Sequence, residues 1–436
     1  MNSKNERKLI LIELNEINFD IVKKYISNTK LKNFSFIINN NFKTTTAEKE
    51  YSKLEPWIQW VSVHTGMDAD EHKIFRLGES KTFNYEQIFE KVQKKNLSVG
   101  VLFSMNAINK NEKYEYFIPD PWTETQPSNN FWCKVLNKAI KQSVNDNSAK
   151  KIELKSYLII LLACLRFIRP SKYIYFFKLI LNSIKKKWYK VLVLDYLISE
   201  IHLNFIKNKE TNFSTVFYNA GANIQHHYFL NSKKINTKIK NPDWYINPKH
   251  DPIEDMLKLY DRILKSYLDL IDEGYSIIFA TGLSQEPYDR VKFYYRLKDH
   301  NSFLKKVGIK FNRVQKLMTR DFFIFFDNNS DRDLAKTKLE SIVTKNNYKI
   351  FEEIDIKEKC LFVTLTYPNE IERDFQVTWE KKNFLNFYDE INFVAIKNGM
   401  HSKKGYCSYH GEIENFQTKE NDHVKEIFNS INNFFN

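Results

Sequence analysis

The sequence predicts an α/β fold with a doubly wound, mostly parallel sheet flanked by helices. Buried apolar runs of strand length end in polar or glycine-containing loops. Segments with the helical period of 3.6 residues, most clearly 252–272, lie between these runs. Alternation of strand and helix along a chain is typical of a parallel sheet covered on both faces. The expected strands are 8–14, 97–104, 213–218 and 275–280.

The length of 436 residues fits one large α/β core that carries insertions. We expect residues 1–140, 211–285 and 391–436 to build this core. A basic amphipathic helical insertion is predicted at 141–210. A small α/β cap insertion is predicted at 286–390, because apolar runs of strand length flank a helix-like segment there.

The composition excludes global disorder and favours anionic partners. Hydrophobic residues make up 42% of the chain and aromatic residues 15%, which is ample for a packed core. The net charge of +14 favours nucleotide-linked substrates, an anionic membrane surface or nucleic acid.

Cysteine usage and hydropathy indicate a cytoplasmic protein, at most peripheral at the inner face of the membrane. The four cysteines are far apart and form no CxxC pair, so neither a disulfide framework nor a cysteine zinc site is predicted. The first apolar run has the pattern of a strand and lacks a signal-peptide cleavage site. No apolar stretch reaches the roughly 18 to 20 residues that cross a bilayer.

Residues 150–190 are strongly basic and also rich in large apolar side chains. They contain eleven Lys or Arg and one acid, Glu153, and Pro170 divides them into two predicted helices. Basic amphipathic helices of this kind can lie on an anionic bilayer surface. They can equally pack on a core and leave their Lys side chains in solvent. Nucleic-acid binding is the weaker alternative, because no recognised binding module accompanies the segment.

Residues 54–72 have the pattern of a loop-mounted site. Pro56 disfavours helix at Glu55, and a short helix follows and stops at Gly66. Loops of this kind often carry functional side chains. The alternative is a short amphipathic helix that packs its tryptophans against a core. The side chains concerned are Glu55, Trp57, Gln59, Trp60 and His72.

Five short islands, in order over nearly the whole chain, resemble the alkaline phosphatase superfamily. The resemblance is nearest to its nucleotide pyrophosphatase/phosphodiesterase branch and the related sulfatases. In that family the first strand ends in Asp-Gly, where this chain has Asn15-Glu16. A later Thr-Gly corresponds to Thr65-Gly66, and a His-Gly corresponds to His72-Lys73. The resemblance implies the same α/β core.

The departures from the family pattern concern the nucleophile and one metal. The family's nucleophile position falls on Pro56. The Asp-His pair that the family has at a strand end corresponds to Gly282-Leu283, and its first Asp corresponds to Asn15. The resemblance therefore implies that the first metal ion has no ligands in this chain. An ordinary two-metal, covalent phosphatase mechanism is therefore not expected.

The second metal position keeps two of its three ligands. His226 and His401 match family histidines, whereas Ala222 replaces the carboxylate. Zinc normally needs three protein ligands, so no cofactor is expected, or at most one divalent ion held by His226 and His401. The residues that we consider as a recruited third ligand are Glu13, Asn223 and His227.

The chemistry that remains is acid–base chemistry. His226 and His401 are predicted as general acid and base, because imidazole titrates near neutral pH. Glu55 precedes the lost nucleophile position and is predicted as a second proton acceptor. Trp57 and Trp60 offer flat apolar faces for a sugar ring or a base. The polar residues predicted to bind substrate are Glu13, Asn15, Glu16, Gln59, His72, Asn223, Gln225, His227, Ser284 and Gln285.

The leading functional hypothesis is a group transferase. It would move a glycosyl or phospho-type group from a nucleotide-activated donor to a saccharide hydroxyl without a two-metal centre. Arg290, Arg296 and Arg320 are predicted to grip the donor phosphate. The resemblance to degenerate family members implies bacterial capsule or surface-polysaccharide biosynthesis as the pathway. The alternatives are a metal-dependent phosphodiesterase or sulfatase-like hydrolase, and an inactive glycan- or nucleotide-binding pseudoenzyme.

Overall fold

The computed structural model describes residues 7–27, 29–82, 84–110, 113–145, 154–317, 320–380 and 383–436. These residues form two compact units. The first comprises the described residues up to Thr237, Ile246–Pro287 and Gly399–Asn436, and the second Lys238–Tyr245 and Tyr288–Asn398. The predicted cap insertion at 286–390 corresponds to most of the second unit, which also includes Lys238–Tyr245. Part of the basic segment, 150–153, lies outside the described residues.

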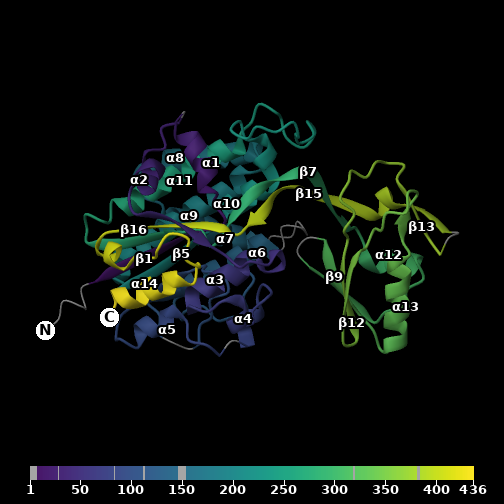
Figure 1. The fold of residues 1–436 in the computed structure, drawn as a ribbon, viewed down its shortest axis with the longest axis horizontal. Coiled ribbons are helices and arrows are strands. Elements are labelled where there is room, and N and C mark those ends of the chain that lie inside the picture. Colours follow the sequence, from purple (N-terminus) through teal and green to yellow (C-terminus); the bar gives the residue numbers. More distant parts are fainter. Residues whose placement is uncertain are drawn as a thin grey trace. The chain divides into compact units, whose positions relative to one another are not determined.

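A seven-stranded sheet forms the centre of the first unit (Figure 1). Its strand order is β2-β16-β6-β1-β5-β3-β4. β1 pairs in parallel with β5 and β6, β3 pairs in parallel with β4 and β5, and β16 is antiparallel to both its neighbours. The doubly wound, mostly parallel α/β fold that the sequence predicts is confirmed. The strands are β1 (Lys8–Leu14), β2 (Phe42–Thr46), β3 (Val99–Leu102), β4 (Tyr116–Ile118), β5 (Phe213–Tyr218), β6 (Tyr275–Ala280) and β16 (Lys404–His410).

Helices pack against this sheet and against one another. Their bounds are α1 (Phe19–Ile26), α2 (Lys32–Asn39), α3 (Pro56–Thr65), α4 (Ala69–His72), α5 (Ile88–Gln93), α6 (Phe131–Asn145), α7 (Leu154–Phe167), α8 (Tyr173–Lys185), α9 (Tyr189–Lys209), α10 (Ala220–Tyr228), α11 (Pro252–Leu268) and α14 (Glu426–Phe434). Within the described residues, we find no helix that combines the length and the apolar character needed to cross a membrane.

The apolar run of β1 explains its central position. The side chains from Leu9 to Ile12 are fully buried, as expected for a parallel strand covered on both faces. The strand ends at Leu14, and the polar residues Asn15 and Glu16 follow it. Ligands of such sheets usually bind at the carboxyl ends of the strands, so this edge positions the site.

The helix α3 begins and ends where the sequence predicts. Pro56 occupies its first turn, where a missing N–H costs nothing. Gly66 ends it with a φ of +71°, and a Cβ at this position would lie 2.8 Å from the Phe428 ring. Glu55 lies just before the helix in an extended conformation, as the following proline requires.

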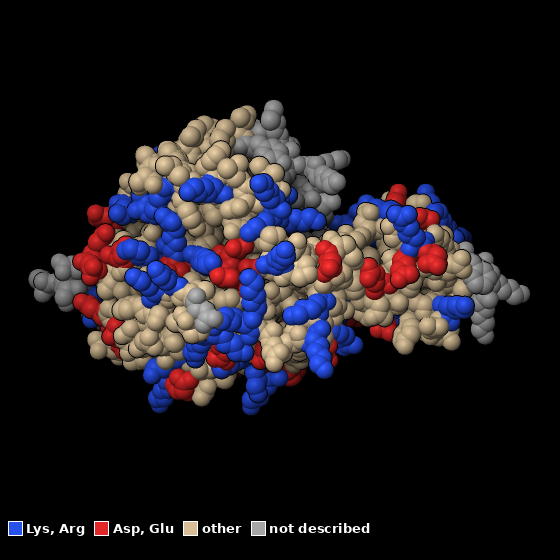
Figure 2. Space-filling model, turned by 90° about the horizontal axis from the view of Figure 1, so that it is seen from above, with Lys and Arg blue, Asp and Glu red and all other residues tan. Residues whose placement is uncertain are grey.

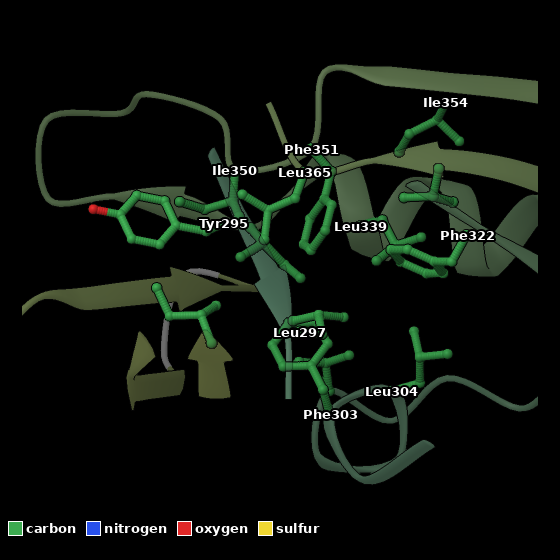
Figure 3. Packing of buried hydrophobic residues seen from close by; sticks show 14 of the residues in the cluster. Tyr295, Leu297, Phe303, Leu304, Phe322, Leu339, Ile350, Phe351, Ile354 and Leu365 are labelled. Carbon is green, nitrogen blue, oxygen red and sulfur yellow. The ribbon is translucent and has the colours of Figure 1, made fainter. Parts of the chain in front are cut away.

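The second unit has its own hydrophobic core (Figure 3). The core includes Leu297, Phe303, Phe322, Leu339 and Phe351. Its described elements are α12 (His300–Lys306), β8 (Arg313–Lys316), β9 (Asp321–Phe325), α13 (Asn329–Glu340), β10 (Val343–Thr344), β11 (Glu353–Lys357), β12 (Cys360–Thr364), β13 (Gln376–Trp379) and β14 (Asn383–Asn386). The longer of its two segments, Tyr288–Asn398, begins within strand β7 (Ser284–Leu297) and ends within strand β15 (Ile391–Ser402), and these two strands pair with each other.

The helix of the second unit begins earlier than its apolar pattern indicates. The sequence predicts a helix over 334–343, whereas α13 spans Asn329–Glu340. The side chain of Asn328 accepts a hydrogen bond from the backbone N–H of Asp331 and caps the helix. A polar cap starts a helix independently of the hydrophobic period, which explains the difference.

Candidate functional site

Three side chains from distant parts of the first unit meet at the carboxyl end of β1. Glu16 follows the strand, His226 lies in the last turn of α10, and His401 lies near the end of β15. Oε2 of Glu16 is 3.2 Å from Nε2 of His226 and 3.1 Å from Nε2 of His401. The two Nε2 atoms are 3.3 Å apart. One carboxylate oxygen therefore faces two imidazole nitrogens at once.

The backbone of Glu16 is held in an unusual conformation. Its φ is +60°, in the left-handed region that non-glycine residues rarely adopt. Its N–H donates to the carbonyl of Thr281 over 3.1 Å, and its own carbonyl accepts from Nε2 of Gln225 over 2.7 Å. Strain of this kind is frequently found at functional sites, where the surrounding structure enforces it.

The carboxylate of Glu16 is further held by two amides. Nδ2 of Asn15 donates to Oε1 over 3.1 Å, and Nε2 of Gln285 donates to Oε2 over 2.6 Å. Gln225 fixes the next turn of chain, since its Oε1 accepts from the backbone N–H of Asn18 over 3.0 Å. Three predicted substrate-binding amides thus position Glu16, two through its carboxylate and one through its backbone carbonyl.

The outer nitrogens of both histidines also have partners. Nδ1 of His401 lies 3.4 Å from Oε2 of Glu55. Nδ1 of His226 donates to the carbonyl of Gly399 over 3.3 Å. These contacts orient the two Nε2 atoms toward Glu16. Histidines that bind metals are typically held in the same way, through a carboxylate or a carbonyl on their second nitrogen.

The environment of Glu16 favours its ionised form. Its side chain is 2% exposed, and burial alone would raise the pKa. The charges of His401 and His226, together with their hydrogen bonds, instead hold the pKa of Glu16 well below its usual range. An ionised carboxylate is the form that binds a cation.

The geometry of the three donor atoms fits a single divalent ion. Tetrahedral zinc with bonds of about 2.0 to 2.1 Å has ligand atoms about 3.3 Å apart. The three separations here are 3.1, 3.2 and 3.3 Å. Two histidines and one carboxylate are also a common donor set of catalytic sites with an open position. Glu16, His226 and His401 therefore fit a mononuclear metal centre.

The residues that the resemblance aligns with the family's first metal site are packed in the core. Trp60 is fully buried, and its indole N–H donates to Oδ1 of Asn15 over 2.8 Å. A Cβ on Gly282 would lie 3.2 Å from the Trp60 ring. Leu283 is fully buried in a cluster with Leu54. This arrangement offers no donor set for a second ion among these residues.

Four of the residues predicted to bind substrate lie in the core with partners of their own. Glu13 accepts a hydrogen bond from Ser104 over 3.1 Å and pairs with His64 over 2.8 Å. Gln59 is fully buried and donates to the carbonyl of Lys53. His72 contacts the Ser62 hydroxyl, and burial lowers the pKa of this histidine to about 4. Trp60, described above, likewise presents no exposed face to a ligand.

The remaining predicted residues of the first unit have mixed placements. Trp57 is half-buried, and its indole N–H donates to the carbonyl of Phe75. Asn223 and His227 are half-buried on α10, and Ser284 is buried. The third donor of the cluster is Glu16, so the expectation that Glu13, Asn223 or His227 supplies it is corrected.

The three predicted phosphate-binding arginines belong to the second unit. Arg290 lies 3.6 Å from Asp289 and is exposed. The guanidinium of Arg320 lies 4.4 Å from the centre of the Tyr294 ring and donates to the carbonyl of Leu365. Arg296 is half-buried on β7. Their binding of a donor phosphate stays a prediction.

The sequence predicts Glu16 as a substrate-binding residue and not as a possible metal ligand. The resemblance directed attention to Ala222, where the family has its carboxylate. The signal that points to Glu16 is its position directly after the central strand, in place of the family's glycine. Asn219 was missed as well, although its Oδ1 accepts from Nδ2 of Asn15 over 2.9 Å.

No family model and no curated protein sequence matches the chain. Solved structures do match it at low identity. Phosphonoacetate hydrolase from Sinorhizobium meliloti has 9% identity, with 98% of this chain and 95% of the other covered and a TM-score of 0.45. Murine ectonucleotide pyrophosphatase/phosphodiesterase 5 has 10% identity, with 97% and 93% covered and a TM-score of 0.41. Alkaline phosphatase from the Antarctic bacterium TAB5 has 10% identity, with 98% of both chains covered and a TM-score of 0.39. The chain thus resembles these structures over nearly its whole length, at TM-scores of 0.39 to 0.45.

Proposed function

We propose that the chain is a phospho-type group transferase that works at one metal ion and forms no covalent intermediate. The donor would be nucleotide-activated and the acceptor a saccharide hydroxyl. The observation that carries the proposal is the meeting of Glu16, His226 and His401, whose donor atoms lie 3.1 to 3.3 Å apart. A divalent ion held there would polarise a phosphoryl oxygen and neutralise its charge. Because the ion would act on a phosphoryl group in this way, the site favours phospho-type over glycosyl transfer.

The residues around the cluster supply the other parts of such a reaction. Glu55 is 31% exposed, and its carboxylate contacts His401. It can accept the proton of the acceptor hydroxyl while the acceptor oxygen bonds to phosphorus and the leaving oxygen departs with its electron pair. Pro56 stands where the resembled family has its nucleophile and carries no hydroxyl. Direct attack by the acceptor follows from this substitution.

Hydrolysis is the second candidate, because the same site could admit water as the acceptor. The open ligand position of a two-histidine, one-carboxylate centre suits either acceptor. The place of the reaction in surface-polysaccharide biosynthesis stays a prediction. An inactive binding protein is the outcome that remains if neither product forms.

The decisive experiment has two parts. Metal analysis of the purified chain should find close to one zinc or other divalent ion per molecule, and Glu16→Gln and His226→Ala should lose it. His423→Ala is the matched control, since His423 also pairs with a carboxylate, that of Glu48 at 3.5 Å. Nucleotide-activated donors with a panel of sugar acceptors should then give acceptor-dependent product. A metal-free wild type, or one that only hydrolyses the donor, contradicts the transferase proposal.

A further inference from the structure

The helices α7 and α8 turn apolar side chains outward. On α7, Leu158, Leu161, Leu162 and Leu165 are exposed, a spacing that puts them on one face of the helix. On α8, Ile174, Phe177, Leu181 and Ile184 are exposed at intervals of three and four residues, which also puts them on one face. Ile174 and Ile184 are 74% and 76% exposed. We call these eight residues the outer apolar face.

The opposite sides of both helices are already packed. α7 buries Ala163 and Phe167, and α8 buries Phe176 and Leu179. Ring contacts show two of these packings, since Phe167 lies against Phe205 and Phe176 against Tyr196, both of α9. The outer apolar face is therefore additional to the side that anchors the helices. Contiguous exposed apolar patches on soluble proteins usually mark interaction sites.

The charges beside the outer apolar face have one sign. Residues 154–194 contain no Asp or Glu. Exposed cations lie among the apolar residues, at Arg166 on α7 and at Lys178 and Lys185 on α8. Lys187 and Lys190 follow α8 and are exposed as well. Lys and Arg side chains also predominate over acidic ones on the face of the larger unit in Figure 2.

We propose that α7 and α8 dock on an anionic lipid bilayer, with the outer apolar face at the level of the acyl boundary and the cations at the lipid phosphates. Large apolar residues and Lys or Arg on the same exposed helices are typical of interfacial helices. Protein–protein interfaces are instead depleted in Lys. The cations would select anionic over zwitterionic lipid.

The lengths of the helices fit docking on the bilayer surface. α7 has 14 residues and α8 has 13. At 1.5 Å per residue each is about 20 Å long, shorter than the roughly 30 Å hydrocarbon core. A short 3-10 turn, Pro170–Lys172, separates them. Docking would bring a lipid-linked donor or acceptor to the enzyme. This consequence rests on the proposed function, whereas the docking itself does not.

Vesicle sedimentation tests the docking without reference to activity. The full chain is mixed with phosphatidylcholine vesicles that contain either no anionic lipid or about 30% phosphatidylglycerol, which gives the bilayer a negative surface potential. We expect at least tenfold stronger partitioning to the anionic vesicles and a large loss of binding in high salt. Equal partitioning to both vesicles, or none, overturns the proposal.

Two surface variants separate the apolar and the ionic contributions to vesicle binding. I174S/I184S should lower anionic vesicle binding at least tenfold at any salt, and K178E/K185E should lower it mainly at low salt. The matched controls are L334S and K305E, at exposed positions of the second unit. Unchanged thermal unfolding shows that each variant is folded. If the patch variants bind vesicles like wild type, the proposal is wrong. If instead I174S/I184S dissociates a dimer that binds no vesicles, the face belongs to a second copy of the chain.

Discussion

The carboxylate of Glu55 lies 3.4 Å from Nδ1 of His401, the ring nitrogen opposite the one that faces Glu16. The imidazole thus lies between a buried acid and a half-exposed acid. A carboxylate in this position orients the ring and raises the basicity of its other nitrogen. Because Glu55 is also the more exposed of the two acids, it is the one that a bound ligand can reach more easily.

Replacing Glu55 by Gln should reduce turnover more than metal content. The amide keeps the shape of the side chain but accepts no proton, so we expect turnover to fall on the order of 10²-fold, within the usual range for a general base. Turnover and metal content should be measured on the same preparation. The control is Glu50→Gln, five residues upstream on the surface. Loss of metal in proportion to activity would show that Glu55 only supports the metal centre.

Zinc should stabilise the folded chain through Glu16. An ion that binds only the native state adds about 2.7 kcal/mol of stability at 100 times its dissociation constant. Thermal unfolding with chelator and with added zinc should show this difference for wild type. Glu16→Gln should abolish it, because a neutral amide replaces the carboxylate between the two histidines. An equal zinc effect in both proteins would place the ion elsewhere.

Replacing Trp60 should destabilise the protein more than replacing Trp57. Trp60→Phe removes the N–H that Oδ1 of Asn15 accepts in the core, and we expect a loss of about 1 to 3 kcal/mol. Trp57→Phe removes a bond at a half-buried position and should cost less than about 1 kcal/mol. Urea unfolding of the two variants compares these costs directly. Weaker ligand binding by Trp60→Phe without loss of stability would favour the prediction that a sugar ring or a base stacks on Trp60.

The sequence predicts the sheet and the histidines but not the ligand set. β1, β5 and β6 are recognisable because parallel strands covered on both faces are continuous apolar runs. His226 and His401 follow from the family pattern. Glu16 could not be identified as their partner, since its role depends on a positive φ and on contacts with residues more than 200 positions away. The burial of Glu13, Gln59, Trp60 and His72 likewise depends on tertiary packing that a single sequence does not show.

The buried carboxyl of Asp195 should make stability fall as the pH rises toward neutrality. It accepts hydrogen bonds from the hydroxyl of Tyr260 over 2.6 Å and from the backbone N–H of Ala220 over 2.8 Å. Burial raises the pKa of Asp195 to about 7 from its usual 3.8. The native state therefore keeps its proton between these values while the unfolded chain releases it, so the stabilising contribution is complete below pH 4 and is lost by about pH 7.

Asp195→Asn isolates this contribution, because the amide does not titrate. Between pH 5 and 7 wild type should lose stability relative to the variant by up to about 1.4 kcal/mol per pH unit. Denaturant unfolding at several pH values measures the difference. Other groups, such as the buried His72, affect both proteins equally and cancel. Parallel stability curves would mean that Asp195 is ionised in the native state.

Gly399→Ala should weaken metal binding at the proposed site without replacing any of its three donor side chains. A Cβ at this position would lie 2.1 Å from Oε1 of Gln285 and 2.9 Å from the carbonyl oxygen of Gln225. The Gln285 side chain must then move, and with it the amide that donates to Glu16 over 2.6 Å. Loss of such a supporting hydrogen bond typically lowers metal affinity 10- to 100-fold. Competition with a zinc chelator measures this change. Gly405→Ala is the control for a tight glycine of the same unit, since its Cβ would lie 2.6 Å from Oγ1 of Thr45 and 2.7 Å from the carbonyl oxygen of Gly282, and not against Gln285. Equal affinities in Gly399→Ala and wild type would show that Gln285 does not support the Glu16 carboxylate as a ligand.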